Sequence, residues 1–324
     1  MEESKIRSNK FTSRSRKRTN RPNKHVRAKK VKLEEPVDDI IPPLVPFEAH
    51  FDSFLKDNAG FFTEMKTPNL TKVNKEYYKR RLLTSWKDPR IDLFKEEWIH
   101  DKRCLDIGCN EGVFTILIAD KYSPHLIIGC DIDFKLIEKA IINLRKRSVK
   151  TPLLHPLVDT GKVNKIKNLI EKLPLSYQVA LKNLETEEIK INEKLKDIVM
   201  FKQENYIANP NAKEKYDVVF CMSTSKWIHL TYGDIGIKAL FYKIYNSLTN
   251  GGLFIFENEP WSSYKKKKSM DTLFKENCKN IKLRPHSFEK YLTVVLKFTL
   301  IEKLRPPALD TMKGYDRTIL IFRK

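Results

Sequence analysis

The chain has 324 residues, of which 41% are hydrophobic and 32% are charged, and its formal net charge is +21. This length suits one large domain with extensions, and no segment approaches the ~20 apolar residues of a membrane span, which argues against an integral membrane protein. Residues 1–33 carry a net charge of +11, residues 34–39 carry −4, and residues 40–324 keep +14. A basic folded body favours a polyanionic partner, most often nucleic acid.

Residues 1–47 are predicted to form a disordered basic arm and linker. Within them, 14–32 has two basic clusters and no hydrophobic periodicity. The two clusters suit a nuclear-import signal and would neutralise RNA phosphates equally well, so we expect a nuclear protein. Residues 48–324 are predicted to form the folded domain, which begins with a mostly helical stretch.

From residue 103 onward, apolar strand-like runs alternate with helical segments. This alternation predicts a doubly wound α/β domain, with a mostly parallel sheet covered on both faces. The expected parallel strands, each followed by an amphipathic helix, are 103–108, 126–131, 198–203, 217–222 and 252–257. A Lys/Asn/Glu-rich stretch at about 148–196 is too long for an ordinary connection and is predicted to be an insertion. The last two runs, 298–304 and 317–322, have no helix between them and predict an antiparallel hairpin.

The five cysteines are odd in number and have no paired CxxC spacing. They are interpreted as buried small hydrophobes in a reducing compartment. No His/Cys cluster has the ligand spacing of a zinc site, so we expect no bound metal.

The first predicted strand and helix, CLDIGCNEGVFTILIA (104–119), are joined by a tight turn bearing Gly108, Asn110 and Gly112. Such a turn lets the backbone approach a ligand, and the following helix offers free N–H groups. A purely structural turn remains the alternative. Asp131 ends the second strand, where a carboxylate accepts hydrogen bonds from both ribose hydroxyls of an adenosine ligand, although it also suits a helix cap.

Both NAD and S-adenosylmethionine (SAM) bind in a crevice of this kind. The turn lacks the full three-glycine pyrophosphate fingerprint, and Asp106 stands where a carboxylate attracts the cationic methionine part of SAM. The terminal antiparallel hairpin is also typical of SAM-dependent methyltransferases, so SAM is favoured. At the end of the third strand, Asn205 and Tyr206 are candidates to meet the adenine, with a strand-end turn as an equal alternative.

The fourth strand ends in a polar cluster within YDVVFCMSTSKWIHLTYGDIG (216–236). Because ligands bind at the carboxyl ends of parallel strands, Ser223, Lys226 and His229 are expected at the methyl-transfer end. Each also has an ordinary structural interpretation, and Trp227 suits core packing equally well. Further on, EPWSSYKKKK (259–268) interleaves aromatic and basic residues, which suits RNA stacking and phosphate contacts, with a solvated charge run as the alternative.

These segments together resemble the bicoid-interacting-protein family of RNA methyltransferases, which includes the 7SK methylphosphate capping enzyme. The resemblance rests on LDIGCNEG (105–112), GCDID (129–133), ENYI (204–207), the SxxKWxHL and PWSSY combinations and the final KGYDRTILIF (313–322). It implies a class I SAM-dependent methyltransferase, with a Rossmann-like sheet, that methylates a terminal 5′ phosphate of a small noncoding RNA, and a La-related protein as companion.

The resemblance also implies roles for individual residues. The expected SAM-site residues are Asp106, Gly108, Asn110, Gly112, Asp131, Asn205 and Tyr206. The expected catalytic residues at the phosphate end are Ser223, Lys226, His229, Arg81 and Tyr78. The resemblance adds Trp227 at the phosphate end, and together with the aromatic and basic pattern of 259–268 the expected RNA-binding residues are Trp227, Trp261, Tyr264, Lys265, Lys266, Lys267 and Lys268.

A phosphate oxygen is already ionised near neutral pH and needs no general base, so alignment with the methyl donor is expected to dominate catalysis. Lys226 and Arg81 are expected to offset the phosphate charge. The alternative is an RNA-end-binding assembly factor with weak or no catalysis. Glu259 favours this alternative, because it adds a negative charge near a site expected to hold phosphate.

Overall fold

The computed structural model describes residues 62, 86, 88–148, 192–209, 214–306 and 317–324. Contacts divide the chain into residues 1–40 and 41–324, and all the described residues belong to the second unit. The expected arm (1–47), Tyr78, Arg81 and most of the expected insertion lie outside the described residues. Within these described ranges, no helix is long and apolar enough to cross a membrane.

The described part of the chain contains a seven-stranded sheet in the order β3-β2-β1-β4-β5-β7-β6. The strands are β1 (Arg103–Ile107), β2 (Leu126–Asp131), β3 (Val199–Gln203), β4 (Tyr216–Cys221), β5 (Leu248–Glu257), β6 (Thr299–Leu304) and β7 (Ile319–Arg323). The pairs among β1 to β5 are parallel, whereas β7 runs antiparallel to both β5 and β6. The doubly wound sheet and the terminal antiparallel hairpin are therefore confirmed.

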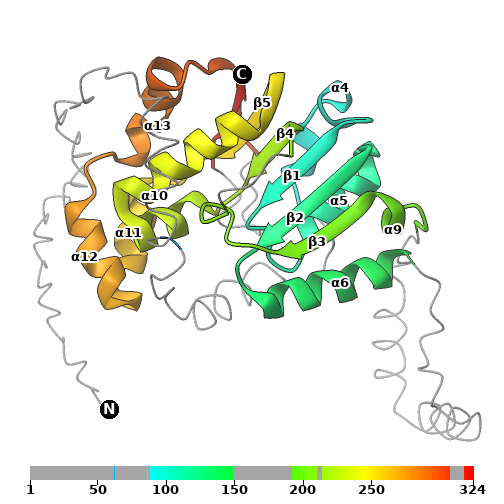
Figure 1. Ribbon diagram of the computed structural model, residues 1–324, viewed down its shortest axis with the longest axis horizontal. Coiled ribbons are helices and arrows are strands. Elements are labelled where there is room, and N and C mark those ends of the chain that lie inside the picture. Colours follow the sequence, from blue (N-terminus) through cyan, green and yellow to red (C-terminus); the bar gives the residue numbers. More distant parts are fainter. Residues whose placement is uncertain (1–61, 63–85, 87, 149–191, 210–213, 307–316) are drawn as a thin grey trace, which may run out of the picture. The chain divides into compact units, whose positions relative to one another are not determined.

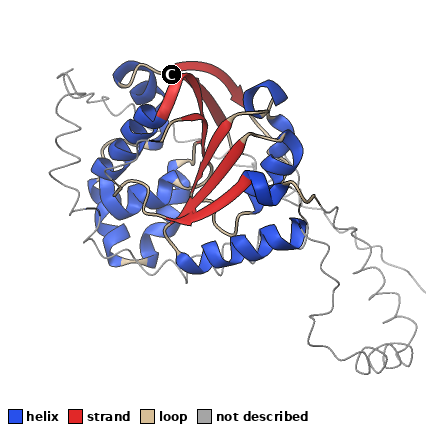
Figure 2. Cartoon of the chain, turned by 45° about the vertical axis from the view of Figure 1, so that its right-hand side comes forward, coloured by secondary structure: helices blue, strands red, loops and turns tan. Residues whose placement is uncertain are grey.

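Helices cover both faces of this sheet (Figures 1 and 2). The helices are α4 (Glu96–Ile99), α5 (Val113–Tyr122), α6 (Phe134–Ser148), α9 (Leu195–Ile198), α10 (Ser225–Ser247), α11 (Trp261–Lys267), α12 (Thr272–Asn280) and α13 (Phe288–Lys290). Short 3-10 turns are η1 (Ile91–Leu93), η2 (Lys268–Met270) and η3 (Pro285–Ser287), and η4 (Tyr291–Val295) is a π-helix. The expected helix after the third strand is not found in the described residues 204–209 and 214–215, which form turns and extended chain.

Alternate residues of each strand pack into separate cores on the two faces. Leu105 of β1 and Val219 of β4 face α10, where Phe241 and Ile244 join them in one buried cluster. The opposite face is built around Phe220, whose ring packs edge-on against Phe114 of α5 and Phe94 at ring-centre distances of 5.6 and 5.8 Å. Burial on both faces explains why these strands are continuous apolar runs in the sequence.

The cysteines fit this packing. Four of them are buried, Cys278 is half-buried, and all are free. Burial raises the pKa of the thiols of Cys104, Cys130 and Cys221, which keeps them protonated and makes them weak nucleophiles.

Helix α10 changes direction at Gly233, which has φ 65° and ψ −159°. The side-chain amide of Asn277 donates to the carbonyls of Leu230 and Thr231, both at 2.9 Å. These bonds satisfy carbonyls at the break and fasten α12 to the first half of α10. That half begins with the polar cluster that follows β4, so the kink fixes where this cluster lies.

Candidate active site

The turn after β1 packs directly on the turn after β4. Gly108 has φ 74°, and a Cβ added there would lie 2.2 Å from the hydroxyl oxygen of Thr224. That hydroxyl donates to the carbonyl of Ile107 at 3.0 Å. Only glycine combines this left-handed backbone with so close an approach. The two loops therefore meet between β1 and β4, where the strand order of the sheet reverses. Ligands of such sheets bind at this topological switch point.

Backbone groups of the β1 turn fix the carboxylate of Asp131. Asn110 adopts φ 56°, and its backbone N–H donates to Asp131 Oδ2 at 3.0 Å. The N–H of Asp133 donates to the other oxygen, Oδ1, also at 3.0 Å. Burial raises the pKa of Asp131, and these two hydrogen bonds oppose the rise. Each oxygen has a second lone pair, so the half-exposed carboxylate can still accept from a diol.

Gly112, at φ 74°, caps the start of α5 and lies close to side chains of two other elements. A Cβ there would lie 2.4 Å from the ring of Phe201 on β3 and 2.8 Å from the Cβ of Ala140 on α6. The turn thus joins three elements. Its glycines are required by neighbouring protein atoms, which accounts for the turn chemistry without any ligand.

Asp106 lies at the end of β1 beneath this turn. It is 2% exposed and accepts a hydrogen bond of 2.6 Å from the hydroxyl of Thr115. Burial raises the pKa of Asp106 to about 6, while the Thr115 hydrogen bond and the positive charge of Arg90 act in the opposite direction. The Asp106 carboxylate therefore gains or loses its proton near pH 6.

The two expected adenine contacts lie in different environments. Asn205 is half-buried, and its amide donates to the Tyr232 hydroxyl and to the Phe62 carbonyl, both at 3.1 Å. Tyr206 is 5% exposed, its hydroxyl shares a hydrogen bond of 2.6 Å with Ser247, and the Lys243 ammonium lies 4.6 Å from its ring centre. The Tyr206 hydroxyl is bonded inside the core, so the expected contact of Tyr206 with SAM stays a prediction that this hydroxyl does not support.

A buried cluster of charges lies at the carboxyl ends of β4 and β5. Glu257, the last residue of β5, is 0% exposed. Its Oε2 accepts from the Ser223 hydroxyl at 2.8 Å and from the Arg90 guanidinium, and its Oε1 accepts from Arg317 at 3.1 Å. Ser223 itself has φ 60°, so the chain turns sharply as it leaves β4. Asp88 holds the rest of the Arg90 guanidinium, at 2.6 Å.

Lys226 points into the same cluster. Its ammonium donates to Glu259 Oε1 at 2.7 Å and to the Ser263 hydroxyl at 2.9 Å, and it lies 4.7 Å from the ring centre of Trp227. Arg317 bonds the same Glu259 oxygen at 2.9 Å. Burial lowers the pKa of Lys226, and the charge of Glu259 opposes the change. The lysine thus reaches the strand ends as expected, with a carboxylate as its present partner.

His229 does not face this cluster. It is 0% exposed, and its Nε2 lies 2.9 Å from Asp234 Oδ1 while Nδ1 lies 3.4 Å from the Tyr264 hydroxyl. Asp234 in turn accepts from the backbone N–H groups of Lys282 and Leu283. Both ring nitrogens have protein partners, so the side chain makes structural contacts in this arrangement, and the expected catalytic role of His229 stays a prediction. His229 links α10 to the chain that follows α12.

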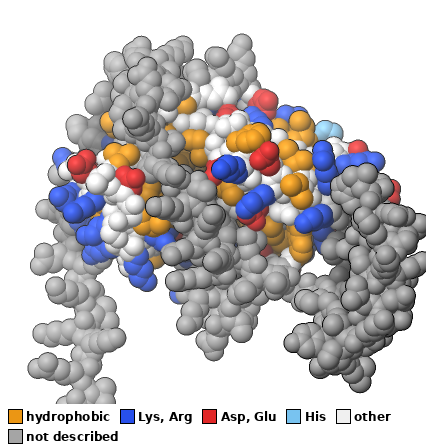
Figure 3. All heavy atoms as spheres, turned by 90° about the horizontal axis from the view of Figure 1, so that it is seen from below, with side chains coloured by type: hydrophobic (Ala, Val, Ile, Leu, Met, Phe, Trp, Pro, Cys, Tyr) orange, Lys and Arg blue, Asp and Glu red, His pale blue; other side chains and the backbone are white. Residues whose placement is uncertain are grey.

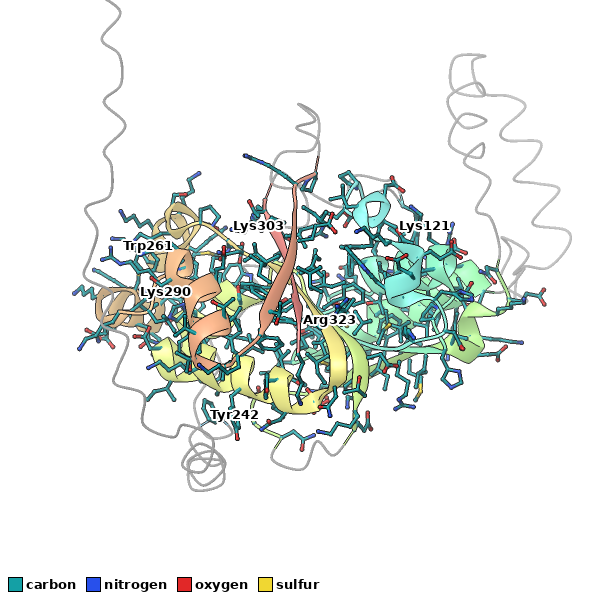
Figure 4. The ribbon with its side chains drawn as sticks, turned by 90° about the horizontal axis from the view of Figure 1, so that it is seen from above. Lys121, Tyr242, Trp261, Lys290, Lys303 and Arg323 are labelled. Atoms are coloured by element: carbon teal, nitrogen blue, oxygen red, sulfur yellow. The ribbon has the colours of Figure 1, made fainter. Side chains whose placement is uncertain are left out.

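The aromatic residues expected to contact RNA lie mostly inside the fold. Tyr264 is 0% exposed and Trp261 is 8% exposed, and both belong to the buried cluster between α10, α11 and α12. Trp227 is half-buried against Phe274, at a ring-centre distance of 6.1 Å. Figure 4 shows Trp261 on one side of the hairpin that carries Lys303 and Arg323, with Lys121 on the other side. Periodicity within so short a helix gave no indication that its aromatic face is buried.

The basic residues of α11 and η2 do reach the surface. Lys265, Lys266 and Lys268 are exposed and Lys267 is half-buried. Figure 3 shows Lys and Arg side chains gathered on the side of the domain where α11 and α12 lie in Figure 1. The lysines thus form a charged surface to which the buried rings of Trp261 and Tyr264 contribute little.

Sequence reasoning missed Arg317, Glu257 and Arg90. The signal for Glu257 was present in LFIFENE, where a carboxylate ends an otherwise apolar strand. A buried carboxylate requires cationic or hydrogen-bonding partners. The two arginines had no such local signal, because Arg317 approaches from the residues before β7 and Arg90 from the segment before η1.

The residues at these strand ends fit SAM by their chemistry. A half-exposed carboxylate held by backbone N–H groups suits the ribose diol, and the adjoining turn with its helix N-terminus suits the rest of the nucleoside. The cationic cluster beside it suits an anionic acceptor. Sheet order, antiparallel last strand and site together define a class I SAM-dependent methyltransferase.

Comparisons with known proteins agree with this class. Residues 216–324 match the model of the family described as Bicoid-interacting protein 3 (Bin3). A protein of Arabidopsis thaliana named "Probable RNA methyltransferase" is 36% identical over 258 residues, which cover 77% of this chain and 79% of that protein. The chain belongs to the Bin3 family.

Two further relatives carry more specific names. The human 7SK snRNA methylphosphate capping enzyme is 33% identical over 74% of this chain, and the alignment spans 37% of the human protein. The U6 snRNA methylphosphate capping enzyme Amus of Drosophila melanogaster is 29% identical over 77% of this chain and 73% of that protein. The chain therefore corresponds to a little over a third of the human relative's length.

Proposed function

We propose that this protein is a SAM-dependent RNA methyltransferase that methylates the terminal 5′ phosphate of a small noncoding RNA. The observation that carries the proposal is the position of Lys226, a buried cation in the charge cluster that also includes Ser223. It lies two residues from Thr224, which packs on the β1 turn. The names of the relatives supply the substrate class. Because these relatives are named as enzymes, catalysis is favoured over RNA binding without turnover.

SAM supplies a methyl group on a sulfonium, which is electrophilic without further activation. The protein's part is to hold the acceptor. Lys226 and Arg317 offset the charge of the terminal phosphate, and Ser223 offers a hydroxyl within the same cluster. An ionised phosphate oxygen needs no general base, so the gain comes from alignment, which supplies up to about 7–11 kcal/mol in favourable cases.

Cofactor binding is assigned to the β1 turn and the end of β2. Asp131 would accept from the ribose hydroxyls, Asn110 and the turn glycines shape the backbone around the nucleoside, and Asn205 borders this region. Asp106 supports the turn from below and contributes negative charge towards the methionine part. Tyr78 and Arg81 remain proposed phosphate contacts on the strength of the resemblance alone.

RNA beyond its first nucleotide is proposed to run over the basic surface of α11 and η2, formed by Lys265, Lys266, Lys267 and Lys268. Exposed lysines give a salt-dependent attraction to RNA phosphates that is independent of sequence. A nuclear location is proposed from the basic clusters of the arm and from the snRNA named in the relatives. A La-related protein is proposed as companion from the family resemblance.

The test is a transfer assay with radiolabelled SAM and three RNAs of one sequence, ending in a 5′ triphosphate, monophosphate or hydroxyl. Label in the phosphorylated RNAs and none in the hydroxyl RNA is expected, with the γ-phosphate of the triphosphate end as the preferred acceptor. Equal label in all three RNAs would show that the methyl group goes elsewhere, and no label in any would remove the enzymatic proposal.

A further inference from the structure

The phosphate-binding cations of the proposed site already have an anionic partner. Glu259, 1% exposed, bonds both Lys226 at 2.7 Å and Arg317 at 2.9 Å through the single oxygen Oε1. An anion that enters beside these two cations must therefore compete with a carboxylate of the protein. Such competition is strong, because charges interact with little screening away from bulk water.

Glu259 is held less firmly than its neighbour Glu257. Both oxygens of Glu257 accept hydrogen bonds, from Ser223 and Arg90 on one side and from Arg317 on the other. Glu259 Oε2, in contrast, is buried and has no hydrogen-bond partner in the described structure. A buried oxygen without a partner is unfavourable, so a modest rearrangement of this side chain loses little. Glu259 is the carboxylate that gives way most readily.

RNA offers two kinds of phosphate to this site. Internal phosphodiesters carry one negative charge each, whereas a terminal phosphate monoester approaches two charges near pH 7, because its second pKa is about 6. A singly charged phosphodiester matches the charge that Glu259 already provides and gains no electrostatic advantage over it. A doubly charged terminal phosphate brings an additional charge to Lys226 and Arg317 and displaces the carboxylate.

We propose that Glu259 is a specificity-determining residue, which occupies Lys226 and Arg317 and thereby reserves them for dianionic phosphate monoesters against phosphodiesters. Arg317 is then a second phosphate-binding residue. This inference rests on the proposed function, since it concerns the same acceptor site. It explains why a buried acid lies in a site for anions: without it, the many internal phosphates of any RNA would compete with the single terminal one.

The experiment measures binding separately from catalysis. Dissociation constants for methyl phosphate, a monoester, and dimethyl phosphate, a diester, are obtained by 31P NMR titration of the full chain. Wild type is expected to bind the monoester at least about tenfold more tightly than the diester. In Glu259→Gln, the diester affinity is expected to rise about tenfold. The ratio of monoester to diester affinity is expected to shrink accordingly, because no carboxylate then competes for Lys226 and Arg317. Glu259→Asp, which keeps the charge, is expected to keep the ratio.

Glu302→Gln is the matched control, because Glu302 lies on β6 in an exposed pair with Lys95 and loses the same charge on substitution. Its ratio is expected to equal that of wild type. Arg317→Gln, measured as a second variant, is expected to weaken monoester binding at least about fivefold. An unchanged ratio in folded Glu259→Gln, or unchanged monoester binding in Arg317→Gln, would overturn the inference. Should Glu259→Gln fail to fold, the Arg317→Gln and Glu259→Asp results decide it.

These outcomes are distinct from failure of the proposed function. Absence of methyl transfer to phosphorylated RNA in wild type removes the activity but leaves the binding ratio measurable. Conversely, normal transfer with an unaltered ratio in Glu259→Gln removes the role of Glu259 and leaves the activity in place.

Discussion

The two halves of the site are built by different means. At the ends of β1 and β2, backbone groups position the site: the N–H groups of Asn110, in a turn with left-handed residues, and of Asp133 donate to Asp131. At the ends of β4 and β5, side chains position the site: Glu257 and Glu259 form ion pairs with cations from three distant parts of the chain. The first half is local in sequence and the second is not.

This difference predicts how each half responds to substitution. A side chain fixed by backbone N–H groups can be removed with little effect on its surroundings, since the turn persists through its own geometry. A member of a buried charge cluster cannot be removed alone without leaving an uncompensated charge. Variants in the cofactor half should therefore lose cofactor binding with little loss of folding stability. Variants in the acceptor half need a second substitution that removes the opposite charge.

The largest expected effect is on methyl transfer in Lys226→Met. Loss of the cation should lower kcat by about 10²–10³-fold, the size seen when one charge-stabilising donor is removed from an active site. Binding of S-adenosylhomocysteine, measured by calorimetry, should change less than about threefold, because Lys226 lies outside the cofactor half.

Lys226→Met also leaves Glu259 with only Arg317, and breaking a buried pair commonly costs about 3–5 kcal/mol. The double variant Lys226→Met/Glu259→Gln serves as the control: it should regain most of the unfolding free energy and stay inactive. Recovery of activity in the double variant would show that Lys226 acts only by balancing Glu259.

The next effect is on cofactor binding in Asp131→Ala. Loss of the two hydrogen bonds expected from the ribose hydroxyls should weaken S-adenosylhomocysteine binding by about 30–160-fold, at ~1–1.5 kcal/mol for each bond. RNA affinity should not change. Asp133→Ala, which removes a nearby carboxylate that accepts from the Lys135 N–H, is the comparison. If both variants bind the cofactor equally well, Asp131 has only its structural role in the turn.

A smaller effect is expected from the basic surface. Replacing Lys265, Lys266 and Lys268 by glutamine should reduce the slope of log K against log salt by about 2, at ~0.7 for each phosphate contact of a single strand. The drop should be independent of RNA sequence. The matched triple variant Lys146→Gln/Lys194→Gln/Lys196→Gln lies on α6 and near α9, and it should leave the slope unchanged. Equal slopes for both triple variants would move RNA to another surface.

The smallest effect concerns the pH dependence of stability at His229. Burial lowers the pKa of His229 in the folded protein, so the unfolded chain binds a proton first as pH falls through about 6.5. Stability from this residue is therefore present above pH 6.5 and is lost on acidification. Between pH 7.5 and 5.5 the loss from a single proton is at most about 1.4 kcal/mol, which lowers Tm by at most a few degrees.

His229→Gln removes the titration, so its Tm should fall less than that of wild type over the same interval. His125→Gln, at an exposed position, provides the comparison and should follow wild type. Identical acid sensitivity in His229→Gln and wild type would mean that folding does not shift the pKa of His229, and a larger fall in His229→Gln would mean that folding raises it.

The cofactor half shows how far the sequence alone reached. Glycine and asparagine at 108, 110 and 112 predicted the turn, and a carboxylate at the end of the next apolar run predicted Asp131, because both signals lie within a few residues of a strand end. These local signals did not show that the Tyr206 hydroxyl bonds Ser247 inside the core. Three residues beyond the end of β3, the direction of the Tyr206 side chain depends on α10, which lies elsewhere in the sequence.

The acceptor half was recognised in part. The SxxKWxHL segment identified Lys226 and Ser223, whose side chains do reach the cluster, but it did not show that His229, one helical turn further, faces Asp234 and Tyr264. Trp261 and Tyr264 looked like a stacking surface because Lys265 to Lys268 follow them, and they are core residues because α12 covers them.

By itself, the sequence determined the order of strands along the chain, the terminal hairpin and the cofactor turn, since each depends on hydrophobic periodicity and on backbone preferences of adjacent residues. Only the tertiary structure decided that Arg90 and Arg317 converge on Glu257, and that Glu259 occupies Lys226. Charges attract through space regardless of their separation along the chain, so their partners become known only when the sheet brings them together.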